Sequence, residues 1–160
     1  MLNILFFINH SISTSATSST LSTLSTNNPT PSFKQSNPMK YTYAFEKMAV
    51  WHVAKNAVKN IYVKTKSFPR EESFGMTSQI RRAGVSICCN LAEGSARISH
   101  ADQSRFYEIA FGSAVEVINL LIISKELGYL SDGDYLEIRP ELEMLTYQIN
   151  QLSGKKPNRP

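Results

Sequence analysis

The sequence predicts an all-α protein, an antiparallel up-down-up-down four-helix bundle. From Met39 onward, apolar residues recur at three- and four-residue steps in four separate stretches, which is the period of an amphipathic helix. Capping residues, glycines and prolines separate these stretches. The connections between the stretches are short, and short connections favour antiparallel neighbours.

Residues 1–38 differ in composition from the rest of the chain. Serine and threonine dominate residues 11–26, and prolines at 29, 31 and 38 interrupt any helix or strand. Such a segment buries too little apolar surface to offset the entropy of ordering it. The mostly apolar residues 2–8 lack the basic flank and the cleavage site of a secretion signal. We expect Met39 to be the natural start, with residues 1–38 an upstream extension or else a disordered tail, and we expect the bundle domain over residues 39–160.

The first helix is predicted from Tyr43 to Lys66, before the break at Phe68-Pro69. Its apolar seam is formed by Val50, Ala54, Ala57, Val58 and Ile61. Trp51 and Tyr62 flank this seam.

The second helix follows Gly75 and ends near Arg97. Its apolar seam is Ile80, Gly84, Ile87 and Leu91. A polar stripe recurs at the same steps on another face and contains Gln79, Arg82, Ser86, Asn90, Glu93 and Arg97. A solvent-facing side would be rich in Lys and Glu, so this mixture of groups favours hydrogen-bonded pairing within the bundle or between subunits. A ligand-facing role is the alternative.

The third helix begins at an N-cap, Ser99, with Asp102 three residues later, and Gly128 follows its end. One apolar seam contains Phe106, Ala110, Ala114, Val117 and Leu121. A second contains Phe111, Ile118 and Ile122. A helix that is apolar on two sides must be covered on two sides. We therefore predict that Phe111, Ile118 and Ile122 form an oligomer interface.

The fourth helix begins at Ser131, with Asp134 in the capping-box position, and ends near Gly154. Its seam is Tyr135 or Leu136, then Leu142, Leu145, Ile149 and Leu152. Pro140 removes one backbone donor inside this helix, which predicts a kink or a break.

Charge is distributed unevenly along the bundle domain. Residues 39–82 carry nine Lys or Arg against three Glu, whereas residues 83–160 carry seven against ten acidic residues. The residues predicted to contact an anionic partner are Lys47, Lys55, Lys59, Lys66 and Arg81. An ordinary solvated lysine face is the alternative.

Catalytic, metal and cofactor sites are not predicted. The adjacent Cys88 and Cys89 lack the spacing of a metal site and are interpreted as reduced packing residues. The histidines at 10, 52 and 100 are scattered, and Ser86 lacks a nucleophile elbow. No run of 18 apolar residues occurs, so no transmembrane helix is expected.

Several motifs together resemble one known family. They are residues 74–97, Gly112-Ser113-Ala114, residues 127–130 and Trp51. Over residues 41–153 the chain resembles the bacterial four helix bundle proteins, also called 23S rRNA-intervening sequence or S23-type proteins. It departs from them at Cys88-Cys89, where the family often has Pro-Ser or Pro-Ala, and at Pro140.

The resemblance implies a cytoplasmic bundle that forms a ring-like homopentamer and has no established enzymatic activity. The accessory protein of diversity-generating retroelements is similar to this family. It is a basic pentamer that engages nucleic acid and a reverse transcriptase.

The sequence thus predicts a non-enzymatic homo-oligomeric scaffold or adaptor. It would bind RNA, another nucleic acid or a nucleic-acid enzyme through the basic surface of the first helix. The alternative is a protein–protein interaction module with no nucleic-acid role. Neither hypothesis includes a membrane partner, a small-molecule substrate or a cofactor.

Overall fold

The computed structural model describes residues 41–154, so the predictions for residues 1–38 lie outside the described residues. Within this range there are four α-helices and no strand. The helices are α1 (Ala49–Lys64), α2 (Met76–Ser95), α3 (His100–Glu126) and α4 (Asp132–Leu152). Two short 3₁₀ helices, η1 (Ala44–Lys47) and η2 (Arg70–Ser73), precede α1 and α2. The prediction of an all-helical fold with four helices is confirmed.

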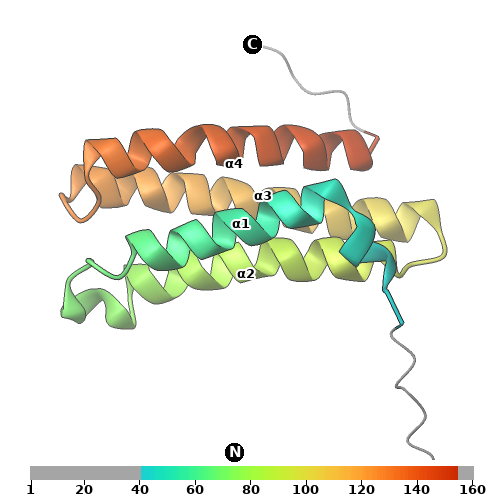
Figure 1. The fold of residues 1–160 in the computed structure, drawn as a ribbon, viewed down its shortest axis with the longest axis horizontal. Coiled ribbons are helices and arrows are strands. Elements are labelled where there is room, and N and C mark those ends of the chain that lie inside the picture. The colour runs from blue at the N-terminus through green and yellow to red at the C-terminus, as the bar shows by residue number, and fades with distance from the viewer. Residues whose placement is uncertain (1–40, 155–160) are drawn as a thin grey trace, which may run out of the picture. The chain divides into compact units, whose positions relative to one another are not determined.

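Each helix packs against its neighbour in the chain, and α4 also packs against α1. Figure 1 shows the four helices lying side by side, with the colour gradient reversing from each helix to the next. The diagonal pairs α1–α3 and α2–α4 make no comparable backbone approach within residues 41–154. The bundle therefore has four grooves on its surface, one between each neighbouring pair.

The core lies along the middle of this arrangement. Its largest fully buried side chains are Ile61, Ile80, Ile87, Leu91, Val117, Leu121, Ile138, Leu142, Leu145 and Ile149. Burying each large apolar side chain contributes about 1.5–3 kcal/mol. All of these residues except Ile138 belong to the predicted seams, but Leu152 was wrongly placed there, because its side chain is 41% exposed at the end of α4.

The helix ends follow the local sequence signals. Ser99 and Ser131 are the N-caps of α3 and α4, and each hydroxyl accepts a hydrogen bond from the backbone N–H three residues later, at 3.1 Å. Gly128 has φ 74° just beyond α3, which favours glycine. The N–H groups of Tyr129 and Leu130 then donate to the carbonyl of Ser124, at 2.8 and 3.2 Å.

The start of α1 differs from the prediction. The α-helix begins at Ala49 rather than Tyr43, because Met48 is extended with φ −80° and ψ 119°. The Glu46 carboxylate accepts a hydrogen bond from the backbone N–H of Tyr43, at 2.9 Å. The ring of His52 is hydrogen-bonded to the Glu46 carbonyl, at 2.8 Å. These side chains stabilise a separate 3₁₀ turn before the helix.

Of the kink or break predicted at Pro140, the break is wrong, since α4 continues through this residue. The missing N–H would have donated to the carbonyl of Leu136. Leu136 is 69% exposed and Pro140 is also exposed, so this carbonyl lies on the solvent side of the helix where water can satisfy it.

Helix α3 bears on the expectation that the chain has no transmembrane helix. It is long enough to cross a membrane and has a mean hydropathy of 1.7 over an 18-residue window. The core helix of a bundle meets the same criterion, and α3 buries Ala110, Ala114, Val117 and Leu121 against the other helices.

Candidate nucleic-acid interface

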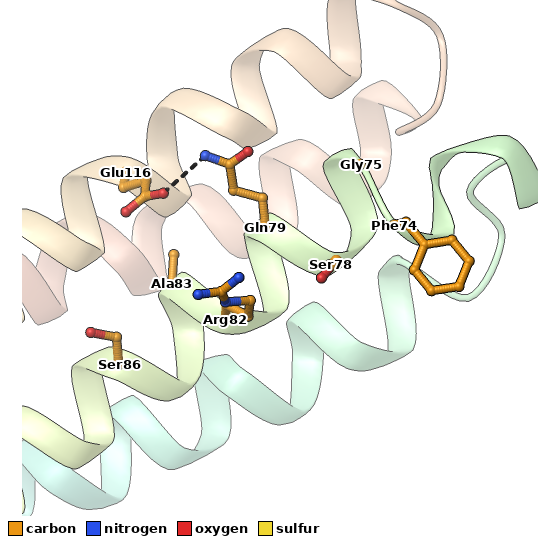
Figure 2. A pocket seen from close by; sticks show the side chains of 8 residues that line it. All are labelled: Phe74, Gly75, Ser78, Gln79, Arg82, Ala83, Ser86 and Glu116. Carbon is orange, nitrogen blue, oxygen red and sulfur yellow. Dashed lines mark hydrogen bonds between the residues drawn. The ribbon is translucent and has the colours of Figure 1, made fainter. Parts of the chain in front are cut away.

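The polar stripe of α2 lies along the groove between α2 and α3. The Gln79 amide donates to the Glu116 carboxylate at 3.3 Å, and Figure 2 shows Gln79 reaching across this groove. The hydroxyls of Ser86 and Ser113 are 2.8 Å apart. The Asn90 amide donates to the carbonyl of Ser86, at 2.8 Å. The Gln79 and Ser86 contacts hold α2 and α3 together, whereas the Asn90 contact lies within α2.

The stripe ends in an exposed ion pair. Glu93 and Arg97 are 3.7 Å apart, and the Arg97 guanidinium lies 4.5 Å from the centre of the Phe106 ring. An exposed pair of this kind contributes little to stability.

Arg82 is the exception within the stripe. Its guanidinium makes no hydrogen bond or ion pair with any residue between 41 and 154. It lines a cavity of about 420 Å³ in the groove between α2 and α3, together with Gln79, Ser86 and Glu116 (Figure 2). Arg82 therefore retains all its donors for a partner outside the described chain.

The predicted lysines of the first helix are exposed. They are Lys55 and Lys59 on α1, Lys47 in the preceding η1, and Lys66, which follows the end of α1. None of the four is paired with a carboxylate in the described part of the chain. The Lys55 ammonium lies 5.2 Å from the centre of the Trp51 ring, within cation–π range.

Lys64, on the same helix, has a different environment. Its ammonium donates to the carboxylates of Asp134 at 2.6 Å and Glu137 at 2.5 Å, both on α4. These two hydrogen bonds raise the pKa of Lys64, and the hydrogen bond from Lys64 lowers the pKa of Asp134. The basic face of α1 therefore stops at the α4 side, where acidic residues neutralise Lys64.

Arg81 is fixed between α1 and α2. Its Nε donates to the Thr65 hydroxyl at 2.9 Å, and its guanidinium carbon lies 4.8 Å from the centre of the Tyr62 ring. The Thr65 hydroxyl is buried and in turn donates to the Ile61 carbonyl, at 2.8 Å. This chain of contacts places a guanidinium against an aromatic ring at the surface.

A second cavity, of about 570 Å³, lies in the groove between α1 and α2. Its lining residues are Tyr62, Ser73, Thr77, Ser78, Arg81, Arg82, Val85, Ser86 and Cys89. Two guanidinium groups and several hydroxyls line it, and no carboxylate does. The sequence did not predict that Tyr62 and Arg82 line this groove. Tyr62 follows Trp51 by eleven residues, close to three helical turns, and this spacing is the signal that places the two aromatic residues on one side of the helix.

The residues predicted as an oligomer interface are Phe111, Ile118 and Ile122, and all three are half-buried within the chain itself. Phe111 and Ile118 pack against its core. More exposed apolar side chains also occur on α3 and α4. They are Ile109, Val115, Ile123, Leu136, Met144, Tyr147 and Leu152.

The cysteines occupy two environments. Cys88 is half-buried, and burial raises the pKa of its thiol to about 11. Cys89 is exposed at the groove between α1 and α2. Within residues 41–154, no three His, Cys, Asp or Glu side chains gather as metal ligands would.

Comparison with known proteins places this bundle in a family. Residues 46–151 match the family described as 23S rRNA-intervening sequence protein. The chain belongs to this family. No curated protein matches the chain at a significant level.

A solved structure supports the fold of this 23S rRNA-intervening sequence family member. It is a protein of unknown function from the S23 ribosomal protein family of Bacteroides thetaiotaomicron. The two share 23% sequence identity with a TM-score of 0.59, over 65% of this chain and 97% of the other. At this identity the likeness concerns the fold alone.

Proposed function

We propose that this chain is a non-enzymatic, homo-oligomeric scaffold or adaptor of the cytoplasm that binds RNA through the basic surface formed by α1 and the segments at its two ends. The proposed assembly is a ring-like homopentamer of up-down-up-down bundles. One observation carries the RNA-binding role: Lys47, Lys55, Lys59 and Lys66 are exposed and have no carboxylate partner among residues 41–154.

The physical basis is neutralisation of phosphate charge. Each lysine that contacts a phosphate releases bound counterions, so affinity falls as salt rises. Four contacts to a single strand give a slope of log affinity against log salt of about −3. A ring repeats the basic surface on every subunit, and repetition converts weak single contacts into useful avidity.

The test combines light scattering of the full chain with RNA binding across a salt series. A discrete oligomer whose RNA affinity falls steeply with salt supports the proposal. Changing Lys55, Lys59 and Arg81 together to Glu should abolish binding while the oligomer persists. An oligomer that does not bind RNA at low salt overturns the RNA-binding role, and a stable monomer overturns the proposed homo-oligomer.

A matched pair of single variants separates location from net charge. Lys59→Glu and Arg105→Glu change the charge equally, and both side chains are exposed without a partner within residues 41–154. Lys59→Glu should weaken RNA binding, whereas Arg105→Glu on α3 should leave it nearly unchanged. Equal losses would mean that total charge, rather than the α1 surface, governs binding.

The second candidate function is a protein–protein interaction module. It is favoured by the exposed apolar side chains of Leu136, Met144 and Tyr147 on the outer side of α4. Salt-independent association with a protein partner, lost on changing these residues to Ser, would support it.

A further inference from the structure

The groove between α1 and α2 differs from the remainder of the basic surface because it is recessed. Its cavity of about 570 Å³ is lined by Tyr62, Arg81, Arg82 and Ser78, among others, and by no carboxylate. A flat lysine face binds phosphates of any nucleic acid, but a recess with an aromatic wall can also accept a base.

The aromatic wall is held in place before any ligand binds. The guanidinium carbon of Arg81 lies 4.8 Å from the centre of the Tyr62 ring, and the Arg81 Nε donates to the Thr65 hydroxyl at 2.9 Å. Thr65 itself is 2% exposed and bonded to the Ile61 carbonyl. Tyr62 remains 42% exposed, so part of the ring is available for contact. A fixed arginine–aromatic pair of this kind offers a flat surface on which a base can stack with little loss of side-chain entropy.

A free cation lies beside this surface. Arg82 also lines the cavity and has no partner among residues 41–154. The Ser78 hydroxyl lines the same cavity. A guanidinium and a hydroxyl next to a stacking surface suit the phosphate that adjoins a stacked base.

A second aromatic group lies further along α1. Trp51 precedes Tyr62 by eleven residues, which places it about 16 Å away and about 20° around the helix. Lys55 packs on Trp51, and the exposed Lys59 lies between the two aromatic residues in sequence. Two basic groups therefore lie between two aromatic groups along one side of α1.

We infer that the groove between α1 and α2 binds single-stranded nucleic acid, with an unstacked base against the Tyr62–Arg81 pair and its phosphate at Arg82. This inference rests on the proposed RNA-binding function and names the form of nucleic acid that the site takes. Bases within a duplex are already stacked on each other and cannot enter a recess of this kind, so the groove discriminates against duplex.

The experiment uses the full chain and fluorescence anisotropy with three probes of about twelve nucleotides, a length that spans several stacking positions. The probes are oligouridine, oligothymidine and a blunt RNA duplex. The variants are Tyr62→Leu and Arg82→Gln. The matched controls are Tyr147→Leu, whose tyrosine is 50% exposed on α4, and Arg105→Gln on α3.

Wild type should bind the single strands more tightly than the duplex. Tyr62→Leu should weaken single-strand binding about tenfold, the contribution of one base stacked on an aromatic ring, and leave duplex binding unchanged. Tyr62→Phe should retain the affinity because it keeps the ring. Arg82→Gln should reduce the salt slope by about 0.7, the value for one phosphate contact on a single strand. The two controls should behave as wild type.

The outcomes separate the inference from the function beneath it. Equal binding of single strands and duplex, with Tyr62→Leu unaffected, overturns the binding site in the groove but leaves the RNA-binding role of the basic surface intact. Failure of all three probes to bind at low salt overturns both. Equal affinity for oligouridine and oligothymidine would mean that the groove binds any single strand. A preference for oligouridine would mean that it binds RNA.

Discussion

The two sides of α2 carry similar polar groups but use them differently. On the α3 side, Gln79 bonds to Glu116 and Ser86 pairs with Ser113, so polar groups of one helix satisfy those of the next. On the α1 side, Arg81 is held by a hydroxyl and an aromatic ring, and no carboxylate lines the cavity. Most polar groups on the α3 side are thus hydrogen-bonded within the protein, whereas cationic groups remain on the α1 side.

The difference shows that residue type alone does not decide whether a polar side chain is available for binding. The stripe from Gln79 to Arg97 is the most conspicuous pattern in the sequence, yet apart from Arg82 its members contact their own chain. What faces a side chain across the groove decides its role. Four predictions test this contrast.

The largest expected effect is on the close contact between α2 and α3. A Cβ added at Gly94 would lie 2.6 Å from Tyr107 Cε1 and 3.2 Å from Phe106 Cβ. Gly94→Ala should therefore destabilise the protein by about 3 kcal/mol, measured by urea unfolding, because the ring and the α3 backbone must shift.

Gly84→Ala is the control on the α1 side. Its added Cβ would lie 3.1 Å from Ile61 Cδ1, which is the flexible end of a side chain. The gain in helix propensity offsets part of the crowding, so the expected change is within about 1 kcal/mol. An equally large loss at Gly84 would show that the two sides of α2 are packed with the same rigidity.

The second prediction concerns the residue that holds Arg81. Thr65→Val removes the hydroxyl that accepts from Arg81 and donates to Ile61, and should cost about 1–1.5 kcal/mol of stability. Single-stranded RNA affinity should fall as well, since Arg81 is no longer fixed. Thr65→Ser keeps the hydroxyl and should keep the affinity. Unchanged affinity in Thr65→Val would mean that the fixed position of Arg81 is unimportant.

A smaller effect is expected for the hydroxyl pair between α2 and α3. In a double-mutant cycle of Ser86→Ala and Ser113→Ala, the coupling energy should be about 0.5–1 kcal/mol, because the two hydroxyls are 2.8 Å apart. Ser113 does not line the cavity between α1 and α2, so Ser113→Ala should leave RNA affinity unchanged. A loss of affinity in this variant would break the division between the two sides.

The last prediction leaves stability untouched and compares the two thiols. At pH 8, iodoacetamide should modify the exposed Cys89 readily and Cys88 slowly, since burial raises the Cys88 pKa to about 11 and keeps it protonated. Saturating single-stranded RNA should slow Cys89 alkylation several-fold, because Cys89 lines the groove. Cys88→Ser isolates the Cys89 signal. A rate indifferent to RNA would place the bound strand elsewhere.

Local signals were sufficient for most of the fold. Ser99, Ser131 and Gly128 act within one turn of their own position, so the sequence shows where α3 and α4 begin and where α3 ends. The expectations that failed depended on surroundings. Whether Pro140 breaks α4 depends on the exposure of Leu136, and the start of α1 depends on side chains of Glu46 and His52.

The sequence by itself determined the four helices and most of the face that each one buries, because a helix has a fixed period and its caps are local. Only the tertiary structure decided which polar groups remain available. Lys64 and Lys59 look alike in the sequence, but Lys64 meets Asp134, seventy residues away, and Lys59 meets no carboxylate in the described chain. Likewise, the Tyr62–Arg81 pair exists only because α1 packs against α2. Contacts between distant residues depend on how the helices pack, and a periodic pattern within one helix carries no information about its partner.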